Sequence, residues 1–310
     1  MKESQVIIVT LLLFCIVLII RGEEIQHINP RRSTNQDLTN QEVNKIIQAE
    51  DGDVYDCIDI NRQPAFNHPL LKDHKIQLKP NSFPVGIDVE NPFMYPISEA
   101  QLPTAECPTG TIPILCNNRQ ENISTKNTDA IVTSQQQERD EVQNKSCNNH
   151  KCPGFVQVSS SVVLGGRIQP VSVYNGPQYA IKFLIFKDPK TENWWLVYGE
   201  EKTAIGYWPS SQFSYMKEMA SKALWGGYVQ GPTASEDSPQ MGSGHFASEG
   251  YGKAAFVRDI QVVNEDNMRV IPNPVKADPG STNRRKYTYE YYGHNPNGMH
   301  VYYGGPGSYS

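Results

Sequence analysis

The chain has 310 residues, of which 38% are hydrophobic and 20% charged, which suits one large domain or a domain with a smaller attached segment. A formal net charge of -5 and a pI near 5.8, with no basic cluster beyond Arg284–Lys286, disfavour nucleic-acid binding. The 16 tyrosines, 23 glycines and 22 prolines favour short strands joined by turns. We therefore expect a mainly β protein.

The N-terminus has the pattern of a secretory signal. Lys2 precedes an apolar run from Val6 to Ile20, and Arg21 follows that run. As a helix the run covers about 22 Å, which is short of the ~30 Å hydrocarbon core of a membrane. We expect residues 1–22 to be a signal peptide that sends the protein to the extracellular space or the vacuole. Because no small-x-small cleavage site follows, an uncleaved anchor is the alternative.

Residues 23–116 are expected to form a mostly irregular segment with one short helix. Thr39 and Glu42 have the spacing of a capping box, and apolar residues follow at helical spacing up to Asp51–Gly52. The pattern from Val54 to Pro80 is strand-like and rich in turns, and residues 81–116 carry prolines without clear periodicity.

The next stretch, residues 117–146, is almost entirely polar. It holds too few apolar residues to build a core, so we expect a linker or a disordered loop. Two N-glycosylation sequons begin at Asn122 and Asn144, as suits an exposed part of a secreted glycoprotein.

Residues 147–310 have the pattern of an antiparallel sheet or β-sandwich. The segments "YAIKFLIFKD" and "NWWLVYG" flank a turn at Asp188–Pro189, which predicts a hairpin. Four further strands are predicted in the segments "TAIGYW", "KAAFVRDIQVV", "RRKYTYEYYG" and "MHVYYGG".

Five cysteines remain outside the signal. In an oxidising compartment the simplest arithmetic is two disulfides and one free thiol, for which Cys116 is our candidate. Cys147, His150 and Cys152 are also candidate metal ligands, but zinc needs a fourth ligand, and a disulfide that closes this small loop is favoured. We expect no metal ion and no cofactor.

Two ordered sets of short motifs cover most of the chain. The first set consists of Asp51–Gly52, Asp56–Ile60, Gln63–Phe66 and His68–Lys72. The second set consists of Cys152–Gln157, Asn193–Leu196, Gly206–Pro209, Trp225–Gly227, Met241–Phe246, Glu249–Ala254 and Tyr303–Gly307. In this order the motifs resemble the activation peptide and the peptidase domain of the neprosin family, plant-type secreted glutamic peptidases.

The resemblance implies a zymogen in which a prosegment, here residues 23–116, precedes a β-sandwich peptidase that cuts next to proline at acid pH. Its catalytic pair is two glutamates, because two nearby carboxyls cannot both ionise easily, so one serves as acid while the other activates water. It also implies disulfides between Cys57 and Cys107 and between Cys147 and Cys152. A third family disulfide is absent, since Val262 stands in place of a cysteine.

Both family glutamates are missing from this sequence. Tyr228 follows Trp225–Gly227 where the family has one glutamate, and the Glu-Ala-Gly-Trp motif that opens with the other does not occur. A phenol with a pKa near 10 is ionised in only ~1 of 10⁵ molecules at pH 5, and losing a general base costs roughly 10²- to 10⁴-fold in rate. We expect an incomplete sandwich, with residues 117–146 replacing part of the catalytic domain, and no intact catalytic residue.

Other residues offer alternative chemistry. Glu249 is a candidate surrogate acid, although a structural turn residue is the favoured interpretation, and Glu192, Glu200 and Glu201 are expected to be solvated. Ser243 with His245 suggests a nucleophile and base, but the motif is not a nucleophile elbow. An active acid peptidase that uses other carboxylates remains the alternative to an inactive homologue.

Binding partners follow from the same features. Trp194–Trp195 and the tyrosine-rich strands are candidates for a platform that binds proline-containing peptides or cell-wall material, although core packing is the commoner role of such aromatics. Strands left uncovered by the missing sheet are expected to permit a homodimer.

Overall fold

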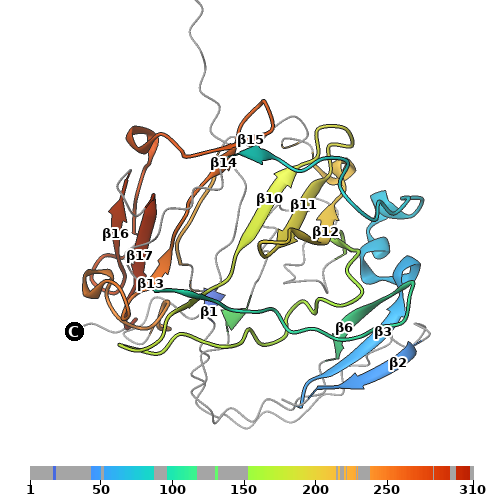
Figure 1. Cartoon of the computed structure of the whole chain (residues 1–310), viewed down its shortest axis with the longest axis horizontal. Coiled ribbons are helices and arrows are strands. Elements are labelled where there is room, and N and C mark those ends of the chain that lie inside the picture. Colours follow the sequence, from blue (N-terminus) through green and yellow to red (C-terminus); the bar gives the residue numbers. More distant parts are fainter. Residues whose placement is uncertain are drawn as a thin grey trace, which may run out of the picture.

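The protein is mainly β, as the sequence predicts, and its sheets are open, as expected of an incomplete sandwich (Figure 1). A computed structural model describes residues 17–18, 43–49, 52–86, 96–116, 130–131, 153–213, 216, 220, 222–227, 229, 238–281, 283–293 and 298–307. Within these ranges no helix has both the length and the apolar character needed to cross a membrane.

The largest sheet has four antiparallel strands in the order β10-β11-β12-β8. Their bounds are Phe183–Lys187 for β10, Trp194–Tyr198 for β11, Thr203–Trp208 for β12 and Val156–Gln157 for β8. The hairpin predicted around Asp188–Pro189 is confirmed, since β10 and β11 pair from Lys187↔Trp194 to Phe183↔Tyr198. We call these four strands the central sheet.

A second sheet lies on the opposite side of the molecule, at the left of Figure 1. It consists of β13 (Ala255–Val257), β17 (His300–Gly304) and β16 (Thr288–Tyr292), with β17 in the middle and both pairings antiparallel. These strands lie where the sequence predicts them. A 3-10 turn, η6 (Ala247–Glu249), packs against β16 and β17.

A third sheet contains β2 (Val43–Gln48), β3 (Val54–Asp59) and β6 (Thr111–Cys116). The helix that we expect near residues 39–51 is wrong for Val43–Gln48, which pair with β3 instead. Six residues with three β-branched side chains make a poor isolated helix, whereas the edge of β3 offers a hydrogen-bonding partner. Ile47 also packs beside buried Tyr55 and Val163, which adds apolar contact to the pairing.

Small ladders join distant parts of the chain. β4 (Val85–Gly86) pairs in parallel with β15 (Met268–Val270), which pairs with β14 (Val262–Val263), and β5 (Ser98–Glu99) pairs in parallel with β9 (Tyr179–Ala180). β1 (Val17–Leu18), within the expected signal, pairs with β7 (Ala130–Ile131), within the expected linker. The other 3-10 turns are η1 (Ile60–Arg62), η2 (Pro64–Asn67), η3 (Pro69–Leu71), η5 (Ser210–Gln212) and η7 (Pro274–Lys276).

Both faces of the central sheet are buried. On one face Phe186, Trp195 and Tyr207 form a core with Ala65 and Leu71 from the turns η2 and η3. On the other face the sheet packs against a second set of N-terminal residues, Ala100 and Leu102, together with Val162 and Ile168. Residues 23–116, which the sequence analysis expects to be the prosegment, therefore supply apolar side chains to both faces of the central sheet.

Candidate functional site

The motif Trp225–Gly227 lies against the C-terminal sheet. Trp225 packs on a core of Ile260, Met299 and Val301. A Cβ at Gly227 would fall 2.6 Å from the Met241 side chain, so this position admits only glycine without rearrangement. Tyr228, which the sequence analysis expects at the position of one family glutamate, lies outside the described residues.

The side chains of Tyr174, His245 and Glu249 come together on the surface of the protein. Tyr174 Oη donates a hydrogen bond to Glu249 Oε2 at 2.9 Å, and His245 Nδ1 lies 2.9 Å from Glu249 Oε1. The Tyr174 and His245 rings stack with their centroids 4.2 Å apart. We call this group the Tyr174–His245–Glu249 cluster. Sequence reasoning considered Glu249 and His245 separately and missed Tyr174, which is 75 residues away from Glu249 along the chain.

The cluster is held in place by backbone contacts on both sides. Glu249 ends the 3-10 turn η6, where its N–H donates to the Phe246 carbonyl. Asn175, next to Tyr174, donates its backbone N–H to the Gly252 carbonyl at 2.6 Å, and the buried Gln178 side chain also reaches that carbonyl. These bonds fix the loop around residues 171–178 against the loop around residues 245–253.

The electrostatics of the cluster favour a stable carboxylate. The hydrogen bond from Tyr174 is the main cause that holds the pKa of Glu249 below its ordinary value, and His245 and Lys253 act in the same direction against partial desolvation. The same hydrogen bond raises the pKa of Tyr174. A general acid needs a raised carboxyl pKa, so the environment of Glu249 is opposite to that of the proton-donating member of a catalytic carboxyl pair.

Ser243 does not complete a nucleophile–base pair with His245. Its hydroxyl accepts a hydrogen bond from the backbone N–H of His245 at 3.4 Å, a bond typical of a turn. Among the described residues no hydrogen bond joins Ser243 Oγ to the His245 imidazole. The geometry therefore supports neither of the two catalytic hypotheses that these residues suggest.

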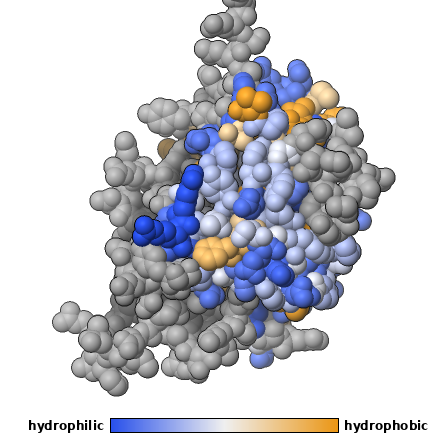
Figure 2. Space-filling view, turned by 90° about the vertical axis from the view of Figure 1, so that its left-hand side faces the viewer, coloured by the Kyte–Doolittle hydropathy of each residue, from blue (hydrophilic) through white to orange (hydrophobic). Residues whose placement is uncertain are grey.

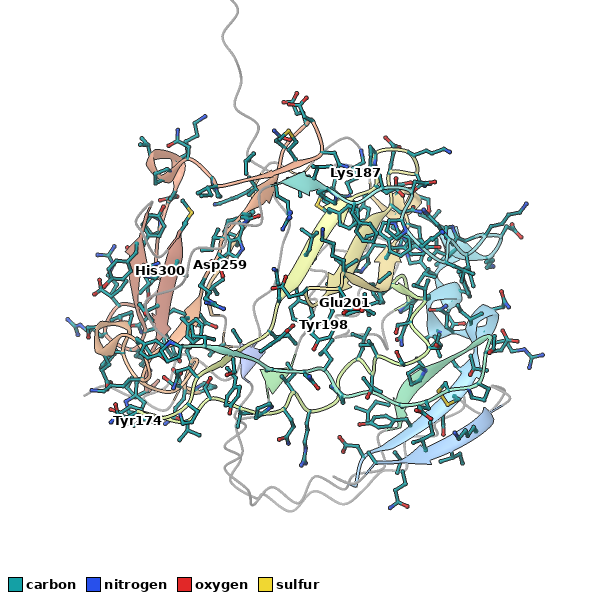
Figure 3. All side chains as sticks on the ribbon, viewed as in Figure 1. Tyr174, Lys187, Tyr198, Glu201, Asp259 and His300 are labelled. Atoms are coloured by element: carbon teal, nitrogen blue, oxygen red, sulfur yellow. A yellow bond between two sulfur atoms is a disulfide. The ribbon has the colours of Figure 1, made fainter. Side chains whose placement is uncertain are left out.

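The remaining candidate carboxylates lie apart from the cluster. Glu192 and Glu200 pair with Lys187 and Lys182 at 3.4 and 2.7 Å, each beside an end of the β10–β11 hairpin. Glu201 is exposed in the turn between β11 and β12. Figure 3 shows Glu201, and Lys187 that pairs with Glu192, in a different part of the molecule from Tyr174, the partner of Glu249.

A buried carboxylate that sequence reasoning missed lies at the start of the turn between β10 and β11. Asp188 has no exposed surface, and its Oδ2 accepts hydrogen bonds from the backbone and side chain of Asn81 at 2.7 and 3.0 Å and from Gln77 at 3.1 Å. Its Oδ1 accepts from the Lys190 N–H at 3.0 Å. Burial opposes ionisation, but these hydrogen bonds outweigh it and lower the pKa of Asp188. The group is a structural anchor of the hairpin turn.

Trp194 and Trp195 have the commoner of the two roles considered for them, since both side chains are buried and pack in separate cores. Tyr287 is buried as well, and Tyr289 and Tyr291 are half-buried. On the side of the molecule that carries β16 and β17 the described surface is mostly hydrophilic, with apolar residues in small separate groups (Figure 2). In the described tyrosine-rich strands these aromatic side chains therefore contribute more to the core than to an exposed binding surface.

Cys57 and Cys107 form a disulfide with their Cα atoms 5.6 Å apart, which is the pair that the resemblance implies. Cys147, His150, Cys152, Asn122 and Asn144 lie outside the described residues, as does the side chain of Cys116. Val262 is in β14. In the part of the chain that the structure describes, no three histidine, cysteine or acidic side chains are arranged to hold a metal ion.

Two family models match the chain. The model described as Neprosin matches residues 121–306, more than half of the sequence, and the model described as Neprosin activation peptide matches residues 46–155. The chain belongs to the neprosin family. Because the two matched ranges share residues 121–155, they do not place the boundary between the neprosin prosegment and the peptidase region, and the boundaries at residues 116 and 146 stay predictions.

Proposed function

We propose that this chain is a secreted neprosin-family protein that does not hydrolyse peptides by the glutamate mechanism of its family. The observation that carries the proposal is the sequence Trp225-Gly226-Gly227-Tyr228, in which a phenol stands where that mechanism needs a carboxylate. The lack of any Glu-Ala-Gly-Trp motif removes the second carboxylate as well. Secretion is supported by the apolar run from Val6 to Ile20, flanked by Lys2 and Arg21.

The site geometry offers no substitute among the described carboxylates that the sequence suggests. Glu249 is the one that lies in a matched motif. Its pKa is lowered by Tyr174 and His245, whereas a general acid that works at acid pH needs a carboxyl that holds its proton more readily than usual. A lone carboxylate also lacks the paired environment in which one acid stays protonated while the other activates water.

An acid peptidase assay tests this proposal. Purified, acid-treated protein is incubated with a proline-containing peptide, and the products are analysed by mass spectrometry. We expect no cleavage by the natural sequence, and none by Tyr228→Glu, because one restored carboxylate lacks its partner. Cleavage that is lost in Glu249→Gln would overturn the proposal and assign the acid role to Glu249.

A second candidate function is non-catalytic binding of proline-containing peptides or cell-wall sugars. The observation that favours it is the Tyr174 ring, which is 50% exposed and is held in one orientation by its bond to Glu249 and its stacking on His245. A fixed aromatic face binds proline rings and sugars with little loss of side-chain entropy.

Binding is tested with a fluorescently labelled proline-containing peptide and fluorescence anisotropy. Tyr174→Ala is expected to weaken binding about fivefold, the equivalent of ~1 kcal/mol of aromatic contact. Tyr292→Ala is the matched control, because Tyr292 is also exposed and also stacks on a histidine, His300, but lies on β16. Equal losses in both variants, or no binding by the natural sequence, would contradict this second candidate.

A further inference from the structure

The activation peptide of a zymogen must leave its enzyme, so the contacts of the corresponding segment here decide whether it can leave. We define the N-terminal segment as residues 54–86 and 96–116, the described part of the prosegment that follows β2. It contacts the central sheet on both faces, and it pairs with two strands outside that sheet, β9 and β15. Three kinds of contact carry the inference.

The first kind is apolar burial. Leu71 and Ala65 have 0% and 1% of their surfaces exposed, and they pack directly with Trp195, Phe186 and Tyr207 of the central sheet. Phe66, Ile76 and Phe83 extend the same contact. Removing the segment would expose large apolar side chains of this sheet face to water, which is unfavourable in proportion to the apolar area exposed.

The second kind of contact replaces a missing strand. β8 is the edge strand of the central sheet, and the side chain of Gln63 satisfies the outward backbone groups of Gln157 in that strand. Gln63 Oε1 accepts from the Gln157 N–H at 2.7 Å, and Gln63 Nε2 donates to the Gln157 carbonyl at 3.1 Å. The amide acts as one residue of a neighbouring strand would, with only 3% of its surface exposed. Without it an edge would be left with unpaired polar groups.

The third kind is a buried polar network. Tyr207 Oη lies 2.8 Å from His74 Nε2 and accepts from the Gln77 N–H at 2.9 Å. The Gln77 side chain bridges two residues of the β10–β11 turn: Nε2 donates to Asp188, and Oε1 accepts from Asn193 at 2.8 Å. Loss of the segment would remove three hydrogen bonds that the Asp188 carboxylate accepts, and hydrogen bonds to a charged group are among the stronger ones in proteins.

The opposite face of the central sheet is held by the same segment. Tyr198 Oη accepts from the Leu102 N–H at 3.3 Å and donates to the Ala100 carbonyl at 3.4 Å. Isolated bridges pair Gln101 with Gln169 and Thr104 with Val162. The sheet therefore lies between two passes of the N-terminal segment, so release would have to open both faces together.

We propose that in this chain the N-terminal segment is a permanent half of the hydrophobic core, which stays bound after the backbone behind it is cut, and not a removable activation peptide. The proposal does not depend on whether the protein has peptidase activity. Its physical basis is that most of the described side chains outside the sheet that cover the face containing Trp195 come from the N-terminal segment, whereas the C-terminal part contributes only Val158 and Val263 among the described residues.

The test uses the full chain with a recognition sequence for a site-specific endoprotease introduced near residue 125. Cys15→Ser and Cys116→Ser are added, so that no cysteine of the first fragment outside Cys57–Cys107 can link the two fragments. Complete cutting is verified on a reducing denaturing gel. The cut protein is then run on size-exclusion chromatography without denaturant, and tryptophan emission is recorded, since all four tryptophans lie in the second fragment. We expect one peak that contains both fragments, and emission unchanged by the cut.

A matched pair of variants separates specific burial from general association. Leu71→Asp places a charge in the core, whereas Leu70→Asp, one residue earlier, changes a side chain that is 60% exposed. We expect the cut Leu71→Asp protein to dissociate with red-shifted tryptophan emission, and the cut Leu70→Asp protein to stay together. If Leu71→Asp does not fold before cutting, Gln63→Ala takes its place, and its fragments are expected to separate at a lower urea concentration than those of the natural sequence.

The opposite results would overturn the proposal. One is separation, in buffer without denaturant, of the two fragments that carry neither the Leu71→Asp nor the Leu70→Asp substitution. The other is a second fragment that elutes alone as a compact species and keeps its tryptophan emission. Equal behaviour of Leu71→Asp and Leu70→Asp would also overturn it.

Discussion

Asp188 is a carboxylate with no exposed surface, held by donors from two parts of the chain. Asn81 and Gln77 come from the N-terminal segment, and the Lys190 N–H comes from the turn that follows β10. Sequence reasoning found this residue only as half of a turn dipeptide, because the donors that make it important are more than 100 residues away in the chain. At the scale of single residues, such long-range polar partners are what the sequence cannot reveal.

Asp188→Asn is predicted to lower the free energy of unfolding by about 2–3 kcal/mol, because the amide turns a donor toward groups that are themselves donors. Urea denaturation followed by tryptophan fluorescence measures the change. Asp278→Asn, at an exposed position, is the control and should change the value by no more than ~0.5 kcal/mol. Equal effects of the two substitutions would contradict a structural role for Asp188.

His74 predicts an acid-sensitive contact between the N-terminal segment and the central sheet. Burial lowers the pKa of His74 below 6.5, while its Nε2 is engaged with the Tyr207 hydroxyl. Because the unfolded chain takes up this proton more readily than the folded chain does, the contribution is fully present above pH ~6.5 and is lost as the pH falls below that value.

The measurement compares urea denaturation at about pH 7.5 and pH 5 for the natural sequence and for His74→Gln, which can hydrogen-bond but does not titrate. We expect stability to fall toward pH 5 by less in His74→Gln than in the natural sequence. Falls of the same size in both proteins would assign the acid sensitivity to other groups.

At the scale of elements, alternation and turn signals predicted most strands of residues 179–304, but the segment "KAAFVRDIQVV", predicted as one strand, contains β13 and β14 in different sheets, and β15 was not predicted. The β10–β11 hairpin, β12, β16 and β17 all form where apolar and aromatic residues alternate between turn residues. The helix predicted near residues 39–51 failed because a single apolar spacing suits a helix and a strand alike over so short a range. The partner strand β3 decided between them.

Packing on both faces of the central sheet gives a prediction for Gly206 in β12. A Cβ at this position would collide with the carbonyl oxygen of Val156 and would lie 2.6 Å from the Phe155 ring. Gly206→Ala is therefore predicted to destabilise the protein by about 3 kcal/mol. Gly280→Ala is the matched control, since nothing lies within 4 Å of its Cβ and its φ is not positive. Thermal unfolding by circular dichroism measures both, and a Gly206→Ala protein as stable as Gly280→Ala would contradict the packing described here.

At the scale of the whole molecule, one disulfide closes the loop that contains η1, η2, η3, β4 and β5. Cys57 and Cys107 are 50 residues apart, and Cys57 is completely buried. Closing a loop of that length removes unfolded-state entropy that corresponds to about 4 kcal/mol at 25 °C. The bond therefore holds together the two passes of the chain that lie on opposite faces of the central sheet.

The double variant Cys57→Ala/Cys107→Ala is predicted to lose about 4 kcal/mol of stability. Urea denaturation under non-reducing conditions measures this loss, with Cys116→Ser as the control for removal of a cysteine outside this bond. A loss below ~1 kcal/mol would show that the packing of the N-terminal segment is independent of the cross-link.

The sequence by itself determined the family and the mainly β architecture. These properties depend on local patterns and ordered motifs, such as the residues from Trp225 to Tyr228, that can be found along a single chain. Only the tertiary structure decided that Tyr174 meets Glu249, that Gln63 takes the place of a strand beside Gln157, and that the N-terminal segment covers both faces of the central sheet. Those contacts join residues 75 to more than 90 positions apart, and pairing over such distances depends on how the whole chain packs and not on any local preference.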